Sequence, residues 1–194
     1  MTASPRIGVL GVGNVLMGDN GIGPFVLKIL ESRYEFPPEV VLHDLGSPGL
    51  DIPSFFVDYD AIILIGAVSA KGRPGGLRLY GKHQLVRAST PERVTPYDPV
   101  LGEALLFAEL GGKCPREILL VGIIPKTTIL GCSLSHAVQV AVVPAISAVL
   151  AELHRLGARA KVRPHEAKPS ILQTEQVSFE FTLGETTHVP GYSG

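Results

Sequence analysis

Three aspartates could take part in acid–base or metal chemistry because of where they lie along the chain. Asp19 and Asp44 follow apolar runs that are typical of buried strands, and Asp98 precedes a segment with helical spacing. A carboxylate can move a proton, bind a cation, cap a helix or stabilise a turn. The structural interpretation is favoured for Asp19, as a helix cap or loop brace, and for Asp98, as a helix cap. For Asp44, turn formation and substrate binding explain the residue equally well.

Seven histidine, serine and cysteine residues could in principle act as ligands or nucleophiles, but none of them lies in a motif for either role. No histidine among them has a ligand-type residue four positions later, no serine lies in a G-x-S-x-G elbow, and the cysteines fit no C-x-x-C spacing. We therefore propose no nucleophile. These residues are His43, His83, His136, Ser69, Ser135, Cys114 and Cys132.

The elements that must position these residues alternate between strands and helices. Apolar runs predict buried strands at residues 7–12, 40–42, 61–65 and 118–124, with a hairpin adding a strand at 77–80. Helical spacing predicts helices at about 22–30, 99–110 and 136–156, the last capped by Ser133 or Ser135 and ended by Gly157. This alternation predicts an α/β fold, a three-layer αβα sandwich around a mostly parallel, roughly five-stranded sheet.

In such a sheet, ligands bind in the crevice formed by the loops at the carboxyl ends of the strands. Three loops are expected there, at residues 11–23, 44–49 and 66–71. A dinucleotide site is one interpretation, because glycines follow the first strand and Asp44 ends the second. The spacing argues against it, since Gly11, Gly13 and Gly18 do not form G-x-G-x-x-G.

The first of these loops, GVGNVLMGDNGIG at residues 11–23, resembles the G-x-G-N-x-L-x-x-D-[DE]-x-x-G signature of the nickel–iron hydrogenase maturation proteases. Residues 44–49, the central strand, residues 120–125 and the helix after Ser135 continue the resemblance, which covers roughly residues 6–157. It implies a compact αβα hydrolase, an endopeptidase. Such a protein recognises the precursor of a hydrogenase large subunit once nickel is installed and removes a carboxyl-terminal extension.

The resemblance also implies a set of three side chains that contact the nickel of the substrate: an acid, an aspartate and a histidine. The matching positions in this chain are Asn20, Gly66 and Tyr97. Asparagine offers only a neutral amide oxygen, glycine has no side chain, and a phenol with a pKa of about 10 seldom binds a divalent ion at neutral pH. We therefore expect no tightly bound metal or cofactor, and nickel only as part of the substrate if the protein is active.

Two functions are consistent with a family signature that is kept and metal-ligand positions that are replaced. In the first, the protein is an endopeptidase that uses Asp19, Asp44 or Asp98 with the nickel of the substrate. In the second, it is an inactive pseudo-protease that serves as a binding partner, chaperone or subunit of a hydrogenase or other redox assembly. Either function would use a crevice formed by Gly13, Asn14, Asp19, Asn20, Asp44, Ser47, Gly66 and Tyr97.

Composition limits the partners and the compartment. The chain has 194 residues with a formal net charge of -1 and 18% charged residues, so it is not built to neutralise nucleic acid. No apolar run has the length of a membrane span, and two distant cysteines suit a reducing, cytoplasmic setting. Residues 1–160 are expected to form the protease-like domain. Residues 161–194 are an extension whose segment 177–183 is expected to form an edge strand or an arm that binds a partner, either the hydrogenase large subunit or a related metalloprotein.

Overall fold

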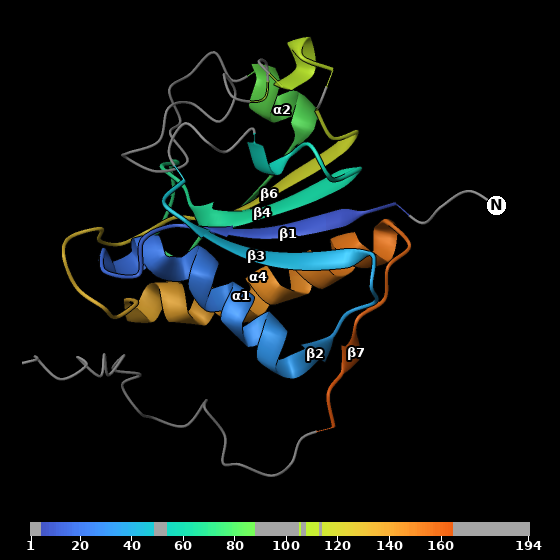
Figure 1. Cartoon of the computed structure of the whole chain (residues 1–194). Coiled ribbons are helices and arrows are strands. Elements are labelled where there is room, and N and C mark those ends of the chain that lie inside the picture. The colour runs from blue at the N-terminus through green and yellow to red at the C-terminus, as the bar shows by residue number, and fades with distance from the viewer. Residues whose placement is uncertain (1–4, 49–53, 88–104, 106–107, 113, 165–194) are drawn as a thin grey trace, which may run out of the picture.

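A computed structural model describes residues 5–48, 54–87, 105, 108–112 and 114–164. Within these residues a five-stranded sheet has the order β3-β1-β4-β6-β5 (Figure 1). β1 (Ile7–Val12), β3 (Val40–Gly46), β4 (Ala61–Ala67) and β6 (Glu117–Ile123) are parallel, and β5 (Leu77–Gly81) is antiparallel to β6. The α/β fold with a mostly parallel sheet is confirmed. Tyr97, Asp98, most of the predicted helix 99–110 and the predicted strand 177–183 lie outside the described residues.

The hairpin predicted before β5 is not formed with the central strand. β4 is hydrogen-bonded to β1 on one side and to β6 on the other, so both of its edges are occupied. The chain after β4 therefore runs past β6, and β5 pairs with the outer edge of β6, with Leu77 opposite Ile123. The prediction was wrong because it assumed that strands adjacent in sequence are also adjacent in the sheet.

Helices cover both faces of the sheet, as Figure 1 shows with α1 and α4 on one side and α2 on the other. α1 (Ile22–Arg33) and α4 (His136–Arg155) pack with Ile7 and Val9 of β1, whereas α2 (Lys82–Arg87) shares a cluster with Leu10 and Val12. Successive residues of β1 thus point to opposite faces, and both faces are buried, which explains the continuous apolar run.

α4 is the described helix that is long and apolar enough, by length and composition, to cross a membrane. One side of it is fully inside the protein, because Val138, Ala141, Ala145 and Val149 belong to the core cluster beneath the sheet. Packing of this side against the sheet accounts for its apolar residues. The helix ends at Arg155, and Gly157 follows with a φ of 88°, so the predicted glycine stop is confirmed.

A short two-stranded sheet lies apart from the main one. β2 (Tyr34–Glu35) follows α1 and pairs antiparallel with β7 (Lys161–Val162), which carries the chain away from α4 (Figure 1). The described beginning of the extension is therefore attached to the end of α1 and adds no strand to the main sheet.

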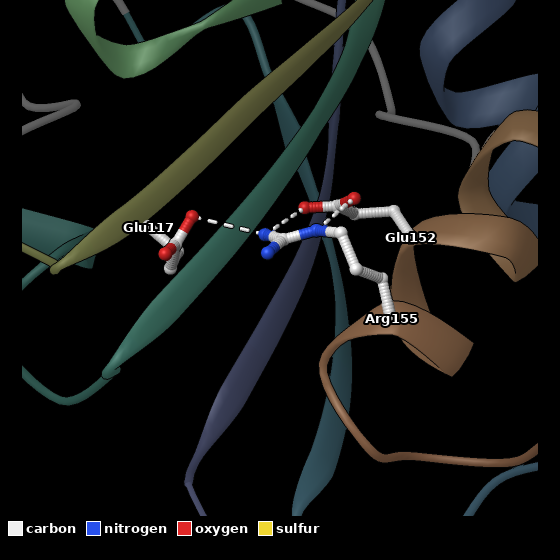
Figure 2. A network of polar contacts seen from close by, with 3 residues as sticks. All are labelled: Glu117, Glu152 and Arg155. Carbon is white, nitrogen blue, oxygen red and sulfur yellow. Dashed lines mark hydrogen bonds and ion pairs between the residues drawn. The ribbon is translucent and has the colours of Figure 1, made fainter.

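A network of charged side chains joins α4 to the amino-terminal edge of the sheet. Figure 2 shows Arg155 between Glu152, one turn earlier in α4, and Glu117, the first residue of β6. Its guanidinium donates to Glu152 at 2.7 and 2.8 Å and to Glu117 at 2.9 Å. The hydrogen bonds with Glu152, opposed by partial burial and assisted by Glu117, raise the pKa of Arg155 above its usual value.

We expect Arg155→Met to lower the free energy of unfolding by about 0.5–1 kcal/mol, because exposed ion pairs are screened by water even when they form a network. Urea unfolding at low salt measures this loss, and about 1 M salt should remove most of it. Arg159→Met is the matched control, since Arg159 is exposed and joins no ion pair among the residues described. Equal losses in both variants would show that the network adds no stability.

Candidate functional site

β1 and β4 are neighbours in the sheet, and the chain leaves their carboxyl ends in opposite directions. After β1 the chain crosses through α1 to β3 on one side, and after β4 it continues to the β5–β6 side. In open α/β sheets ligands bind at such a divergence. Gly66, near the end of β4, faces Val12 at the end of β1: a Cβ on Gly66 would lie 3.1 Å from the Val12 carbonyl oxygen.

The loop after β1 folds back tightly on itself. Gly13 has a φ of +138°, and a Cβ there would lie 1.9 Å from the carbonyl oxygen of Asn20, so only glycine is accommodated. The backbone N–H of Asn14 donates to Oδ1 of Asn20 at 2.5 Å, and Oδ1 of Asn14 accepts from the N–H of Leu16 at 2.9 Å. The glycine and asparagine positions of the signature therefore determine the shape of this loop.

Asp19 is completely buried and accepts four hydrogen bonds from a loop more than 100 residues later. Oδ1 accepts from the N–H of Ser135 at 2.6 Å. Oδ2 accepts from the N–H groups of Lys126 and Thr127, at 2.8 and 3.1 Å, and from the Ser135 hydroxyl at 2.9 Å. Both oxygens thus have protein partners. This arrangement supports the interpretation of Asp19 as a loop brace and argues against a catalytic role.

Ser135 occupies the N-cap position of α4, one of the two predicted. Its side chain makes no capping hydrogen bond, since the hydroxyl is donated to Asp19 instead. Its carbonyl oxygen accepts from the N–H groups of Val138 and Gln139, at 3.0 and 2.9 Å, so the backbone begins the helix. The start of α4 is therefore fixed to η1 (Gly18–Gly21), the single turn that precedes α1.

Asn20 is 2% exposed, and its amide orientation is determined by Asn14. Because a backbone N–H can only donate, the atom that it contacts must be the amide oxygen, and Nδ2 points elsewhere. Nδ2 is buried and has no hydrogen-bond partner. The free polar atom of Asn20 is therefore a buried donor, whereas a cation would require a free oxygen.

Asn20 and Gly66 do not fit a divalent ion. The one oxygen of the Asn20 side chain already accepts from Asn14, and Gly66 contributes no ligand atom. Among the described residues no group of three His, Cys, Asp or Glu side chains could hold a metal. Tyr97 and Asp98 lie outside the described residues, so the placement of these two candidates stays a prediction.

Asp44 and Ser47 lie where the sequence predicted, at the end of β3 and just after it, and both are exposed. Oδ1 of Asp44 accepts from the N–H of Gly46 at 2.9 Å, which is the turn-forming bond expected of an aspartate two residues before a glycine with positive φ. The second oxygen has no hydrogen-bond partner among the described residues. Asp44 thus keeps both of its predicted roles, stabilising a turn and presenting charge at the carboxyl edge.

A fourth loop, at residues 124–135, completes this edge and was absent from the three loops predicted. It reaches the β1 loop through a parallel bridge between Met17 and Gly131. The N–H of Gly18 donates to the Gly131 carbonyl at 2.7 Å, and the N–H of Gly131 donates to the Leu16 carbonyl at 2.9 Å. The signal was present, because this loop follows the predicted strand 118–124 and so belongs at the same edge as the others.

A pocket with a volume of about 350 Å3 lies between α1 and these loops. Its walls are mostly apolar, with Phe25 and Leu27 from α1 and Leu134 from the fourth loop, and charged residues are present in its lining. Of the residues that line this pocket, only Asp44 was predicted from the sequence to belong to the site. The others include Val15, Lys28, Glu31 and Cys132.

Fold and site together define a class of protein: an αβα domain with a ligand crevice at the carboxyl edge of a parallel sheet, braced by a buried aspartate. A family model described as "Hydrogenase maturation protease" matches residues 24–152. The chain belongs to the hydrogenase maturation protease family.

Individual relatives support this assignment along most of the chain. The Hydrogenase 2 maturation protease of Escherichia coli K12 is 31% identical over 155 residues, covering 80% of this chain and 94% of the relative. Hydrogenase expression/formation protein HupM of Azotobacter chroococcum is 32% identical over 167 residues, covering 86% and 80%. The structure of the hydrogenase maturating endopeptidase HybD from E. coli superimposes with a TM-score of 0.75 at 32% identity, over 81% of this chain and 98% of that one.

Proposed function

We propose that this protein recognises the precursor of a nickel–iron hydrogenase large subunit at the carboxyl edge of its sheet and, if it is active as an endopeptidase, removes the carboxyl-terminal extension. The observation that carries the proposal is the intact crevice loop, in which Gly13, Asn14 and Asp19 make the contacts that define its shape. Kinship with the hydrogenase 2 maturation protease of E. coli supports the choice of substrate. The reducing setting suggested by two unpaired cysteines supports a cytoplasmic location.

A second candidate function, binding without cleavage, is favoured by the side chains of the crevice. Asn20 and Gly66 provide no cation ligand, and the carboxylate of Asp19 is fully hydrogen-bonded. Of the candidate acids in the described part of the chain, only Asp44 keeps an oxygen without a hydrogen bond. In this mode the protein has no resident metal, and nickel arrives only as part of the substrate.

The experiment that separates the two uses the nickel-loaded large-subunit precursor from the same organism. Mass spectrometry reports whether the extension is removed, and copurification reports whether a complex forms. Removal of the extension supports the endopeptidase, and a stable complex with an intact precursor supports the binding function. If the precursor is neither bound nor cleaved, the proposed function is wrong.

We expect Asp44→Asn to weaken precursor binding by about tenfold, because it removes a negative charge at the pocket, while an amide oxygen can still accept from Gly46. Stability should change by less than about 0.5 kcal/mol, as for most exposed positions. Binding is measured by titration with the precursor. Asp58→Asn is the control, since Asp58 is exposed and precedes β4, at the opposite edge of the sheet. If Asp44→Asn binds as tightly as this control, Asp44 serves the turn alone.

A further inference from the structure

Three exposed apolar side chains gather on the two loops that meet at the Met17–Gly131 bridge. Leu16 is 43% exposed on the first loop, and Ile129 and Leu130 are 73% and 81% exposed on the fourth. We call these three residues, with the bridge between their loops, the loop junction. Exposed apolar side chains that lie together on the surface of a domain mark a site where another protein binds.

The backbone beneath the loop junction is held firmly. The bridge contributes two hydrogen bonds, at 2.7 and 2.9 Å, and the N–H of Asp19 donates to the Thr127 carbonyl at 3.0 Å. The Asp19 carboxylate adds its four bonds to the two ends of the same loop, at Lys126, Thr127 and Ser135. A surface that is already ordered loses little conformational entropy when a partner binds, so its apolar contacts are available for affinity.

The loop junction is also uncharged. Residues 11–18 and 127–135, which form it, contain no Asp, Glu, Lys or Arg, and Lys126, which is exposed, lies just before the second of these ranges. Depletion of charge is what distinguishes the centre of a protein–protein interface from ordinary surface. Its partner should therefore present an apolar, uncharged surface rather than an acidic, basic or nucleic-acid surface.

The position of the loop junction relative to the crevice identifies that partner. The first loop contains Asn14 and Asn20, two of the predicted crevice positions, which are hydrogen-bonded to each other. The pocket beside α1 is lined by Val15 from that loop and by Cys132 and Leu134 from the fourth. Because these loops form one wall of the pocket, a protein whose terminal segment enters it can rest its folded part on them.

We infer that the loop junction is the docking surface for the folded body of the substrate protein, with Ile129 and Leu130 as its main anchors. The inference rests on the proposed function and deepens it, because it separates the residues that hold the body of the precursor from those that contact its terminal segment. A second copy of this chain is the alternative occupant, and the test is designed to detect it.

The test compares two substitutions of nearly equal exposure at opposite ends of the molecule. Ile129→Glu places a charge in the loop junction, and Val162→Glu does the same in β7, where Val162 is 74% exposed. Figure 1 shows β7 far from the loop that leads into α4. We expect Ile129→Glu to weaken binding of the purified large-subunit precursor at least about tenfold, with Val162→Glu close to the unsubstituted protein. Both should keep the thermal midpoint of the parent protein, since neither side chain is buried.

Each outcome of this comparison has one meaning. If the parent protein binds the precursor and Ile129→Glu binds it equally well, the inference is overturned while the proposed function stands. If the parent protein itself does not bind, the proposed function fails first. Size analysis completes the test: a parent dimer that Ile129→Glu converts to a monomer would assign the surface to a second copy and overturn the inference.

Discussion

Asp19→Asn should lower the free energy of unfolding by about 3–5 kcal/mol, because it removes a buried charge that four donors require. The amide keeps one oxygen and replaces the other with a donor. If the nitrogen takes the place of Oδ1, the N–H of Ser135 faces an N–H2 group; if it replaces Oδ2, three donors lose their acceptor. A buried donor left without a partner costs about 1–3 kcal/mol, and every orientation leaves at least two, the displaced donor and the new amide N–H2 group.

Urea unfolding of the purified variant measures this effect. Asp44→Asn is the matched control, since the same chemical change at an exposed aspartate with one turn-forming bond should cost less than about 0.5 kcal/mol. Ser135→Ala should lie between them, because it removes the hydroxyl donor and leaves the backbone donors in place. A loss below about 1 kcal/mol for Asp19→Asn would mean that water replaces the brace and that Asp19 is available for other chemistry.

The sequence was informative about the fold wherever a strand is buried on both faces. β1 and β4 are completely buried, and their unbroken apolar runs identified them within two residues of their observed ends. The position of β5 could not be obtained in this way, because its pattern predicts a strand but does not identify its neighbour. The neighbour depends on which edges of the sheet remain free, and that is a property of the assembled sheet.

The part of the site that was predicted from the sequence is the part that follows the carboxyl ends of the strands. That rule placed the β1 loop and Asp44 at one edge, and the structure agrees. The brace between Asp19 and Ser135 could not be predicted, since it joins residues 116 positions apart. The pocket was also missed, because Lys28 and Glu31 follow helical spacing and resemble ordinary surface residues of α1 until the loop opposite them is known.

The second large effect concerns the positions at which the family has metal ligands. We expect the triple variant Asn20→Glu, Gly66→Asp and Tyr97→His to bind a divalent nickel or zinc ion with a dissociation constant on the order of micromolar, whereas the parent protein does not. Isothermal titration measures the affinity directly. The thermal midpoint provides a second reading, since an ion at about 100 times its dissociation constant stabilises the folded state by about 2.7 kcal/mol.

The structure shows what two of these substitutions would meet. A Cβ at Gly66 lies 3.1 Å from the Val12 carbonyl oxygen, a close contact that a shift of a few tenths of an ångström relieves. At residue 20 the substitution removes a buried amide nitrogen that has no partner. It also introduces a buried charge, which destabilises the metal-free variant and is neutralised when an ion binds.

Gly66→Ala is the control for this variant, because it adds the same Cβ without a carboxylate and should bind no ion. Metal binding by the parent protein at the affinity of the triple variant would mean that other residues have replaced the lost ligands. If the triple variant gains metal affinity but still leaves the precursor intact, the departures at residues 20, 66 and 97 are not the sole barrier to cleavage. If it gains both, those three positions account for the difference between binding the precursor and cutting it.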